Sequence, residues 1–91
     1  MSRLDDSGIA AALGRTPGWE QAGAEIRRTY RFGDFREALA FVNRVGSLAE
    51  AAGHHPDIDI RYNAVTLALT THDAGGLSAK DFELARAIDA R

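Results

Sequence analysis

The sequence predicts an α+β fold: a four-stranded antiparallel sheet with three helices packed on one face, in the order α-β-β-α-β-β-α. Two regions alternate apolar and polar residues, as strands with one buried face do, and three regions place apolar residues three or four apart, as amphipathic helices do. Each helical region also begins after residues that cap helix N-termini. Helices laid on the apolar face are the simplest cover for such a sheet.

The first predicted helix is short. It follows three residues that commonly cap helices, namely Asp5, Asp6 and Ser7. Ile9 and Leu13 lie one turn apart within it, and Gly14 followed by Pro17-Gly18 is predicted to end it. Trp19 is predicted to start the strand region that follows.

The first predicted hairpin reaches Phe32. From Ala24 to Phe32 apolar and polar residues alternate, and only Arg28 breaks the pattern. Gln21-Ala22-Gly23 is predicted as the turn before this strand, and Gly33 as its end. The aromatic residues of this region and of the next helix are predicted to lie in the core: Trp19, Tyr30, Phe32 and Phe35.

The second predicted helix is long. Asp34 and Glu37 have the spacing of a capping box, Ala52 is near its end, and Gly53 is a plausible left-handed stop. Apolar residues spaced three or four apart are predicted to form its inner stripe: Phe35, Ala38, Leu39, Val42, Val45 and Ala49.

A second hairpin and a last helix complete the predicted chain. Alternation from Ile58 to Tyr62 and from Val65 to Leu69, with Asn63 between, predicts two strands. After a glycine-containing loop, Ser78 and Asp81 have the spacing of a further capping box. The last helix has its apolar stripe at Phe82, Ala85 and Ile88.

Composition limits the classes of function. Residues 1–91 are predicted to form one domain, with 45% hydrophobic and 26% charged residues, as in ordinary globular proteins. No apolar run approaches the roughly 20 residues that cross a bilayer. The first residues lack a secretory pattern and the chain has no cysteine, so a cytoplasmic location is expected. A net charge of −2 with scattered arginines does not favour direct nucleic-acid binding.

All three histidines of the chain fall in one short stretch, as His54-His55, followed by Pro56, and as His72. Histidine side chains ordinarily titrate near pH 6.5, so converging imidazoles suggest acid–base chemistry. The simpler alternative is that these histidines lie in an ordinary surface loop without a function. A zinc site completed by Asp57 or Asp73 is another, although adjacent histidines seldom both face one ion. Gly75-Gly76 lacks the lysine of a phosphate loop and is predicted as a turn.

A motif joins these histidines to other residues. Three residues separate Glu50 from His54-His55-Pro56, five lie before Tyr62, nine before His72 and eight before Asp81. This pattern resembles the signature of the pterin-4a-carbinolamine dehydratases. The resemblance extends over nearly the whole chain, through 17–19, 30–32, 34–35, Phe41, 44–45, 62–63 and 71–78.

The resemblance implies dehydration of 4a-hydroxytetrahydropterin, the carbinolamine left by aromatic amino-acid hydroxylases, to quinonoid dihydropterin and water. It implies a 4a-hydroxytetrahydrobiopterin dehydratase that works in pterin recycling without metal or organic cofactor. By similarity, His54 and His72 are the proton-transfer pair, and His55 mainly binds and orients the pterin.

Other positions are assigned by the same resemblance. Glu50 and Asp81 are expected to orient or charge-balance the imidazoles. Many relatives carry Trp where this chain has Ile58, and some carry Cys at Ala74, so the pocket is expected to differ from theirs. The segments that line the pterin in relatives correspond to Pro56, Thr71, Asp73 and Ala74.

Partners are also implied. Relatives form dimers or dimers of dimers, so a homodimer or homotetramer is expected, with an aromatic amino-acid hydroxylase as a pathway partner. Some animal members act as coactivators and some bacterial relatives appear in other assemblies. The alternative function is therefore a non-catalytic interaction or assembly module with the same fold.

Overall fold

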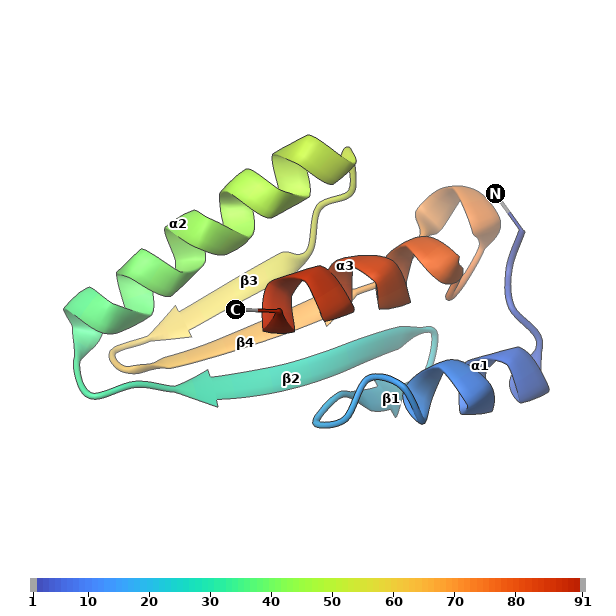
Figure 1. Ribbon diagram of the computed structural model, residues 1–91, viewed down its shortest axis with the longest axis horizontal. Coiled ribbons are helices and arrows are strands. Elements are labelled where there is room, and N and C mark those ends of the chain that lie inside the picture. Colours follow the sequence, from blue (N-terminus) through green and yellow to red (C-terminus); the bar gives the residue numbers. More distant parts are fainter. Residues whose placement is uncertain (1, 91) are drawn as a thin grey trace.

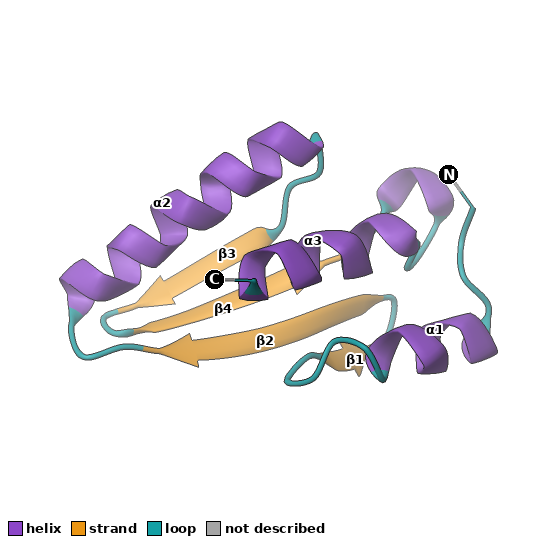
Figure 2. Ribbon diagram, viewed as in Figure 1, coloured by secondary structure: helices purple, strands orange, loops and turns teal. Residues whose placement is uncertain are grey.

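The computed structural model describes residues 2–90 and confirms the predicted order of helices and strands (Figure 1). Figure 2 shows the same view by type of secondary structure. The elements are α1 (Asp6–Leu13), β1 (Glu20–Ala22), β2 (Glu25–Arg31), α2 (Phe35–Ala52), β3 (Asp57–Arg61), β4 (Ala64–Leu69), the short 3-10 helix η1 (His72–Ala74) and α3 (Ala79–Asp89).

The four strands form one antiparallel sheet in the order β1-β2-β4-β3. Its register pairs Ile26 with Leu69, and Val65 with both Tyr30 and Ile60. These apolar residues share one face because side chains alternate along a strand. Helices α2 and α3 lie over that face (Figure 1). The core between them is made of buried side chains from all the layers: Ile26, Tyr30, Ala38, Phe41, Val45, Ala49, Val65, Leu67, Leu69, Phe82, Leu84, Ala85 and Ile88.

The inner stripe of α2 differs from the prediction at two positions. Phe35 is 48% exposed and Leu39 is 42% exposed, so both were wrongly placed in the core. The buried stripe is Ala38, Phe41, Val45 and Ala49. Arg44 donates to the carbonyl of Ile88 and thereby turns one flank of α2 toward α3. Phe35 and Leu39 lie on the opposite flank, where the chain covers only about half of each side chain.

Both hairpin turns differ from the prediction, the first by being shorter and the second by beginning one residue earlier. Gln21 and Ala22 belong to β1, paired with Ile26 and Glu25, and Gly23 makes the turn with a φ of 61°. Tyr62 was predicted in a strand, but it lies in the turn after β3, 67% exposed and with a φ of 50°. The cause is the register of the second hairpin, which pairs Arg61 with Ala64 and leaves two residues for the turn.

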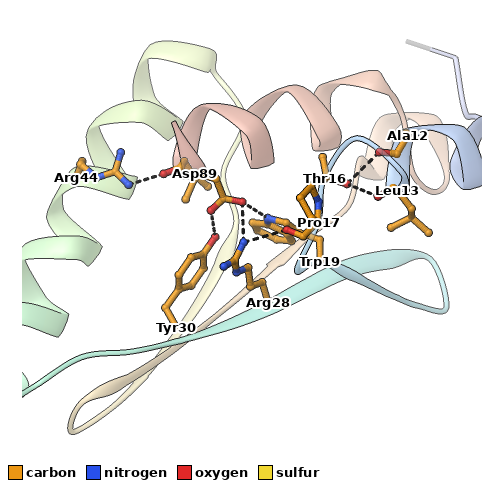
Figure 3. A network of polar contacts seen from close by, with 10 residues as sticks. Ala12, Leu13, Thr16, Pro17, Trp19, Arg28, Tyr30, Arg44 and Asp89 are labelled. Carbon is orange, nitrogen blue, oxygen red and sulfur yellow. Dashed lines mark hydrogen bonds and ion pairs between the residues drawn. The ribbon is translucent and has the colours of Figure 1, made fainter. Parts of the chain in front are cut away.

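A polar cluster fastens the C-terminal end of α3 to the sheet (Figure 3). Asp89 accepts hydrogen bonds from the indole of Trp19 at 2.8 Å, the guanidinium of Arg28 at 3.1 Å and the hydroxyl of Tyr30 at 2.5 Å. Arg28, which interrupts the alternation of β2, also donates to the carbonyl of Pro17 at 3.1 Å. The residue that broke the strand pattern therefore has a structural role.

No helix among residues 2–90 is both long enough and apolar enough to cross a membrane.

Candidate active site

The end of α2 positions the first two histidines. Gly53 adopts the left-handed conformation, with a φ of 62°, that a residue other than glycine or asparagine rarely adopts. The backbone N–H of Gly53 bonds to the carbonyl of Glu50, and that of His54 bonds to the carbonyl of Ala49 at 3.1 Å. These two hydrogen bonds cap the C-terminal end of the helix, and they hold the backbone of His54 in place before the chain continues into β3.

The imidazole of His54 is bound to a buried carboxylate. Its Nε2 lies 2.6 Å from Oδ1 of Asp81, and the side chain of His54 is only 11% exposed. Asp81 is completely buried in the first turn of α3, where its Oδ2 accepts from the hydroxyl of Thr71 at 2.8 Å and from the backbone N–H of Ser78 at 2.9 Å. A buried carboxylate with this many donors is well satisfied.

His55 has a different environment. Its Nε2 contacts Oε2 of Glu50, one turn back on α2, and both side chains are largely exposed, at 61% and 77%. An exposed pair of this kind contributes little to stability. His55 is therefore free to turn toward a ligand at a low energetic cost.

His72 opens η1 directly after β4. Thr71 and Gly76 pair across the loop, and the backbone N–H of Thr71 donates to the carbonyl of Gly76 at 3.1 Å. Gly75 ends η1 in the left-handed region, with a φ of 74°. His72 is exposed, and within residues 2–90 its imidazole has no hydrogen-bond partner. A closed loop thus presents an unpaired imidazole.

These segments come together at one end of the sheet, where the chain enters β3 and leaves β4. A cavity of about 270 Å³ is formed there. His54, His55 and His72 all line it, although 16 residues separate His55 from His72 in the sequence. The other lining residues are Gly53, Thr70, Thr71, Asp73 and Lys80.

The structure does not bring every predicted site residue to this cavity. Pro56 and Ala74 are half-buried and outside its lining. Asp81 stands behind His54 and Glu50 beside His55, which are supporting positions. The side-chain hydroxyl of Thr71 points to Asp81 and its backbone groups bond to Ala74 and Gly76, which leaves only its methyl group to meet a ligand.

Sequence reasoning missed one residue of this region, Lys80, and identified a second, Ser78, only as a helix cap. Lys80 lines the cavity, and Ser78 bonds to both Thr71 and Asp81. The sequence contains a signal that places both residues near the site. The capping box starts the first turn of α3 directly after the loop that carries His72.

The arrangement of side chains in the described residues does not support a metal site. Among the described residues, no group of three or more histidine, cysteine, aspartate or glutamate side chains is arranged to hold a metal ion. Asp57 lies on β3 and is absent from the lining of the histidine cavity.

Comparisons with known proteins agree on one family. The family model described as "Pterin 4 alpha carbinolamine dehydratase" matches residues 2–91. A protein of Thermomicrobium roseum provisionally named as such a dehydratase is 60% identical, with 97% of this chain and 95% of that one covered. One of Chloroflexus aurantiacus, named in the same way, is 62% identical over 98% of this chain and 96% of its own.

Solved structures agree as well. The crystal structure of a transcriptional coactivator/pterin dehydratase from Brucella melitensis superposes with a TM-score of 0.92 at 32% identity, over 97% of this chain and 96% of that one. A pterin dehydratase-like protein described as a RuBisCO assembly factor superposes with a TM-score of 0.67 at 23% identity, over 79% and 86%, which shows a shared fold alone. The chain therefore belongs to the pterin-4a-carbinolamine dehydratase family.

Proposed function

We propose that His54, His55 and His72 form the active site of this enzyme. The chain is a pterin-4a-carbinolamine dehydratase, a hydro-lyase that acts on 4a-hydroxytetrahydropterin in pterin recycling. The observation that carries the proposal for the residues is that imidazoles from two separate segments line one cavity. Two ionisable groups on one small cavity can act on the same substrate.

The reaction needs an acid and a base. The 4a-hydroxyl leaves as water once it is protonated, and the N5–H bond supplies the electron pair that forms the double bond between N5 and C4a. We assign this proton transfer to His54 and His72, because both imidazoles line the cavity and an imidazole can either donate or accept a proton. These two groups suffice for the proton transfers, so we propose that no metal or organic cofactor takes part.

The remaining residues bind and orient. His55 is exposed at the rim with a weakly held partner, which suits a group that contacts the pterin ring. Asp73 lies on the cavity, and its carboxylate can accept hydrogen bonds from the N–H donors of the pyrimidinone edge. Thr71 also lines the cavity, but its backbone groups bond to Ala74 and Gly76, so it would meet the pterin through its methyl group. Pro56 and Ala74 lie outside the cavity lining, so any contact of theirs with the pterin requires the substrate to extend beyond it.

We further propose a homodimer or homotetramer in the cytoplasm, working in the same pathway as an aromatic amino-acid hydroxylase. The support for self-association is the set of large apolar side chains left exposed on the single chain: Phe35, Leu39, Ile58 and Tyr62.

Stopped-flow absorbance of freshly generated 4a-carbinolamine tests the proposal. We expect the wild type to accelerate water loss. We expect His72→Ala and His54→Ala each to lower kcat by about 100-fold or more with a smaller effect on KM. His55→Ala is expected to raise KM more than it lowers kcat.

The matched control is Arg27→Ala, which removes an exposed side chain on the polar face of the sheet and should leave the kinetics unchanged. Equal traces for the wild type and His72→Ala would contradict catalysis by histidine. Such a result would favour the alternative, an interaction or assembly module with the dehydratase fold.

A further inference from the structure

Behind His54 lies a chain of buried polar side chains. Thr71 is 4% exposed, and Ser78 and Asp81 are completely buried. The hydroxyl oxygens of Thr71 and Ser78 are 2.7 Å apart, and the hydroxyl of Thr71 lies 2.8 Å from Oδ2 of Asp81. Three polar groups without access to water cannot exchange partners freely, so each must keep the partner that it has.

The direction of every hydrogen bond in this chain follows from counting protons. Oδ2 of Asp81 is an acceptor for the hydroxyl of Thr71. A hydroxyl carries one proton, so the oxygen of Thr71 can only accept from Ser78. The order therefore runs from Ser78 to Thr71 to Asp81, with the backbone N–H of Ser78 as the second donor to the same carboxylate oxygen.

The same counting applies at the other carboxylate oxygen. An ionised carboxylate only accepts, so Oδ1 of Asp81 requires a proton on Nε2 of His54, 2.6 Å away. A neutral imidazole with its proton on Nε2 has a lone pair on Nδ1. No described residue hydrogen-bonds to Nδ1 of His54, and His54 lines the cavity. Nδ1 is therefore the ring nitrogen that is left for the substrate.

We infer that Thr71 and Ser78 are positioning residues, which hold Asp81 so that it keeps His54 in the Nε2-protonated tautomer and leaves Nδ1 as the proton acceptor. This inference rests on the proposed function. Nδ1 takes the N5 proton, the N5–H electron pair forms the bond to C4a, and the C4a–O bond breaks as the hydroxyl takes a proton from a second group and leaves as water. Asp81 stabilises the imidazolium that forms.

The first test reads the tautomer directly and needs no activity. Full-length protein labelled with ¹⁵N-histidine is examined by long-range ¹H–¹⁵N NMR above pH 7.5, with His55→Gln and His72→Gln used to assign the signals. We expect His54 to show an unprotonated Nδ1 and a protonated Nε2. A protonated Nδ1, or an equal mixture of the two tautomers, would overturn the inference.

The second test measures whether the hydroxyls of Thr71 and Ser78 contribute to catalysis. Thr71→Val is expected to lower kcat by about 10-fold with KM within about twofold, and Thr71→Ser to restore kcat to within about threefold of the wild type. Ser78→Ala removes a donor one step farther from the carboxylate, so its loss should be smaller than that of Thr71→Val.

The matched control is Thr16→Val, which deletes another buried threonine hydroxyl, bonded to the carbonyl of Ala12 at 3.1 Å and outside the lining of the histidine cavity. It should lower the melting temperature as Thr71→Val does while leaving kcat unchanged. If Thr71→Val keeps full kcat, or if Thr71→Ser is as impaired as Thr71→Val, the positioning role is wrong.

The two hypotheses fail in different ways. A wild-type protein that does not accelerate water loss contradicts the proposed function, whereas the NMR result still decides the tautomer of His54. An active wild type with a protonated Nδ1 contradicts the inference alone.

Discussion

A single carboxylate at the start of α1 shows how a cap responds to pH. Asp5 accepts a hydrogen bond from the backbone N–H of Gly8 at 2.8 Å and another from the hydroxyl of Ser7 at 3.1 Å. These bonds, the one from Gly8 first, hold the pKa of Asp5 below its ordinary value of 3.8. The ionised cap therefore stabilises the folded state fully above pH 3.8, and this contribution is lost as the pH falls through the lower folded pKa.

Asp5→Asn keeps a capping oxygen and removes the titration. We expect the difference in melting temperature between the wild type and Asp5→Asn to be constant from about pH 6 to pH 4 and to change in favour of the variant toward about pH 2. Circular dichroism melts at fixed protein concentration measure it. A difference that does not depend on pH would contradict the assignment.

Single residues also show how much of the site the sequence could predict. The three histidines and Asp81 were predicted because the motif spacing is specific, and the structure places the histidines on one cavity with Asp81 behind His54. Lys80 was missed, because whether a side chain in the first turn of a helix faces a cavity depends on how that helix is rotated. The role of Ser78 was found only in part: its capping position is visible in the sequence, but its bond to Thr71 requires the loop to close.

One glycine lies inside helix α2 and another follows its last residue, and their replacement should have opposite effects. Gly53 has a φ of 62°, where a Cβ is strained, although no atom lies within 4 Å of a Cβ built there. Gly46 lies inside the helix, and a Cβ there also meets nothing within 4 Å. We expect Gly53→Ala to lower the free energy of unfolding by about 1 kcal/mol and Gly46→Ala to raise it by up to about 1 kcal/mol.

Urea denaturation at one protein concentration measures both changes, with Gly46→Ala as the matched control for Gly53→Ala. Changes of the same sign in the two variants would show that something other than backbone conformation decides these positions.

Helix α3 is fixed at both ends by carboxylates, Asp81 behind His54 and Asp89 at the far end. The cluster around Asp89 is partly buried, with Arg28 32% and Asp89 27% exposed at the side chain. Asp89→Ala removes the shared acceptor of Trp19, Arg28 and Tyr30 (Figure 3). We expect it to lower the free energy of unfolding by about 2 kcal/mol.

The control is Asp59→Ala, which breaks an exposed ion pair with Arg61 at 3.1 Å and should cost less than about 1 kcal/mol. Urea denaturation measures the free energy of unfolding of both variants. Equal losses in the two variants would mean that the cluster around Asp89 contributes no more than a surface ion pair.

The helices and strands were largely predictable from the sequence. The errors in predicting which of their residues are buried and where they end have one origin. Spacing identifies the apolar side of α2, but it cannot say which part of a wide apolar side meets the sheet. The contact of Arg44 with Ile88 turns α2 toward α3, and Phe35 and Leu39 are left outside. The placement of Tyr62 failed for a similar reason, because pairing register, and not alternation, decides where a strand ends.

At the scale of the whole molecule, the strand order was not predictable from periodicity. The sequence shows two hairpins, but only the structure shows that β2 pairs with β4 and so joins them into one sheet. This pairing matters for the site, because β4 leads directly into η1 while β3 follows the end of α2. The neighbouring strands β3 and β4 thus bring His54 and His72 to the same end of the sheet.

The exposed flank of α2, formed by Phe35 and Leu39, gives a prediction for the assembled protein. Their exposures of 48% and 42% leave two large apolar side chains one helical turn apart in water. Burying the half of each side chain that is still exposed contributes roughly 1 kcal/mol, and in a symmetric interface each residue counts more than once. We expect light scattering after size exclusion to show a dimer or tetramer for the wild type and a smaller mean mass for the double variant Phe35→Ser, Leu39→Ser.

Arg36→Ser is the matched control, because it changes an exposed residue on the same turn of α2 without removing apolar surface. It should keep the wild-type mass. A wild type that stays monomeric at about 100 µM would contradict the proposed homo-oligomer, whereas an unchanged mass in the double variant would show that the chains associate through another surface. In that case Ile58 at the edge strand β3, 39% exposed, is the next residue to replace.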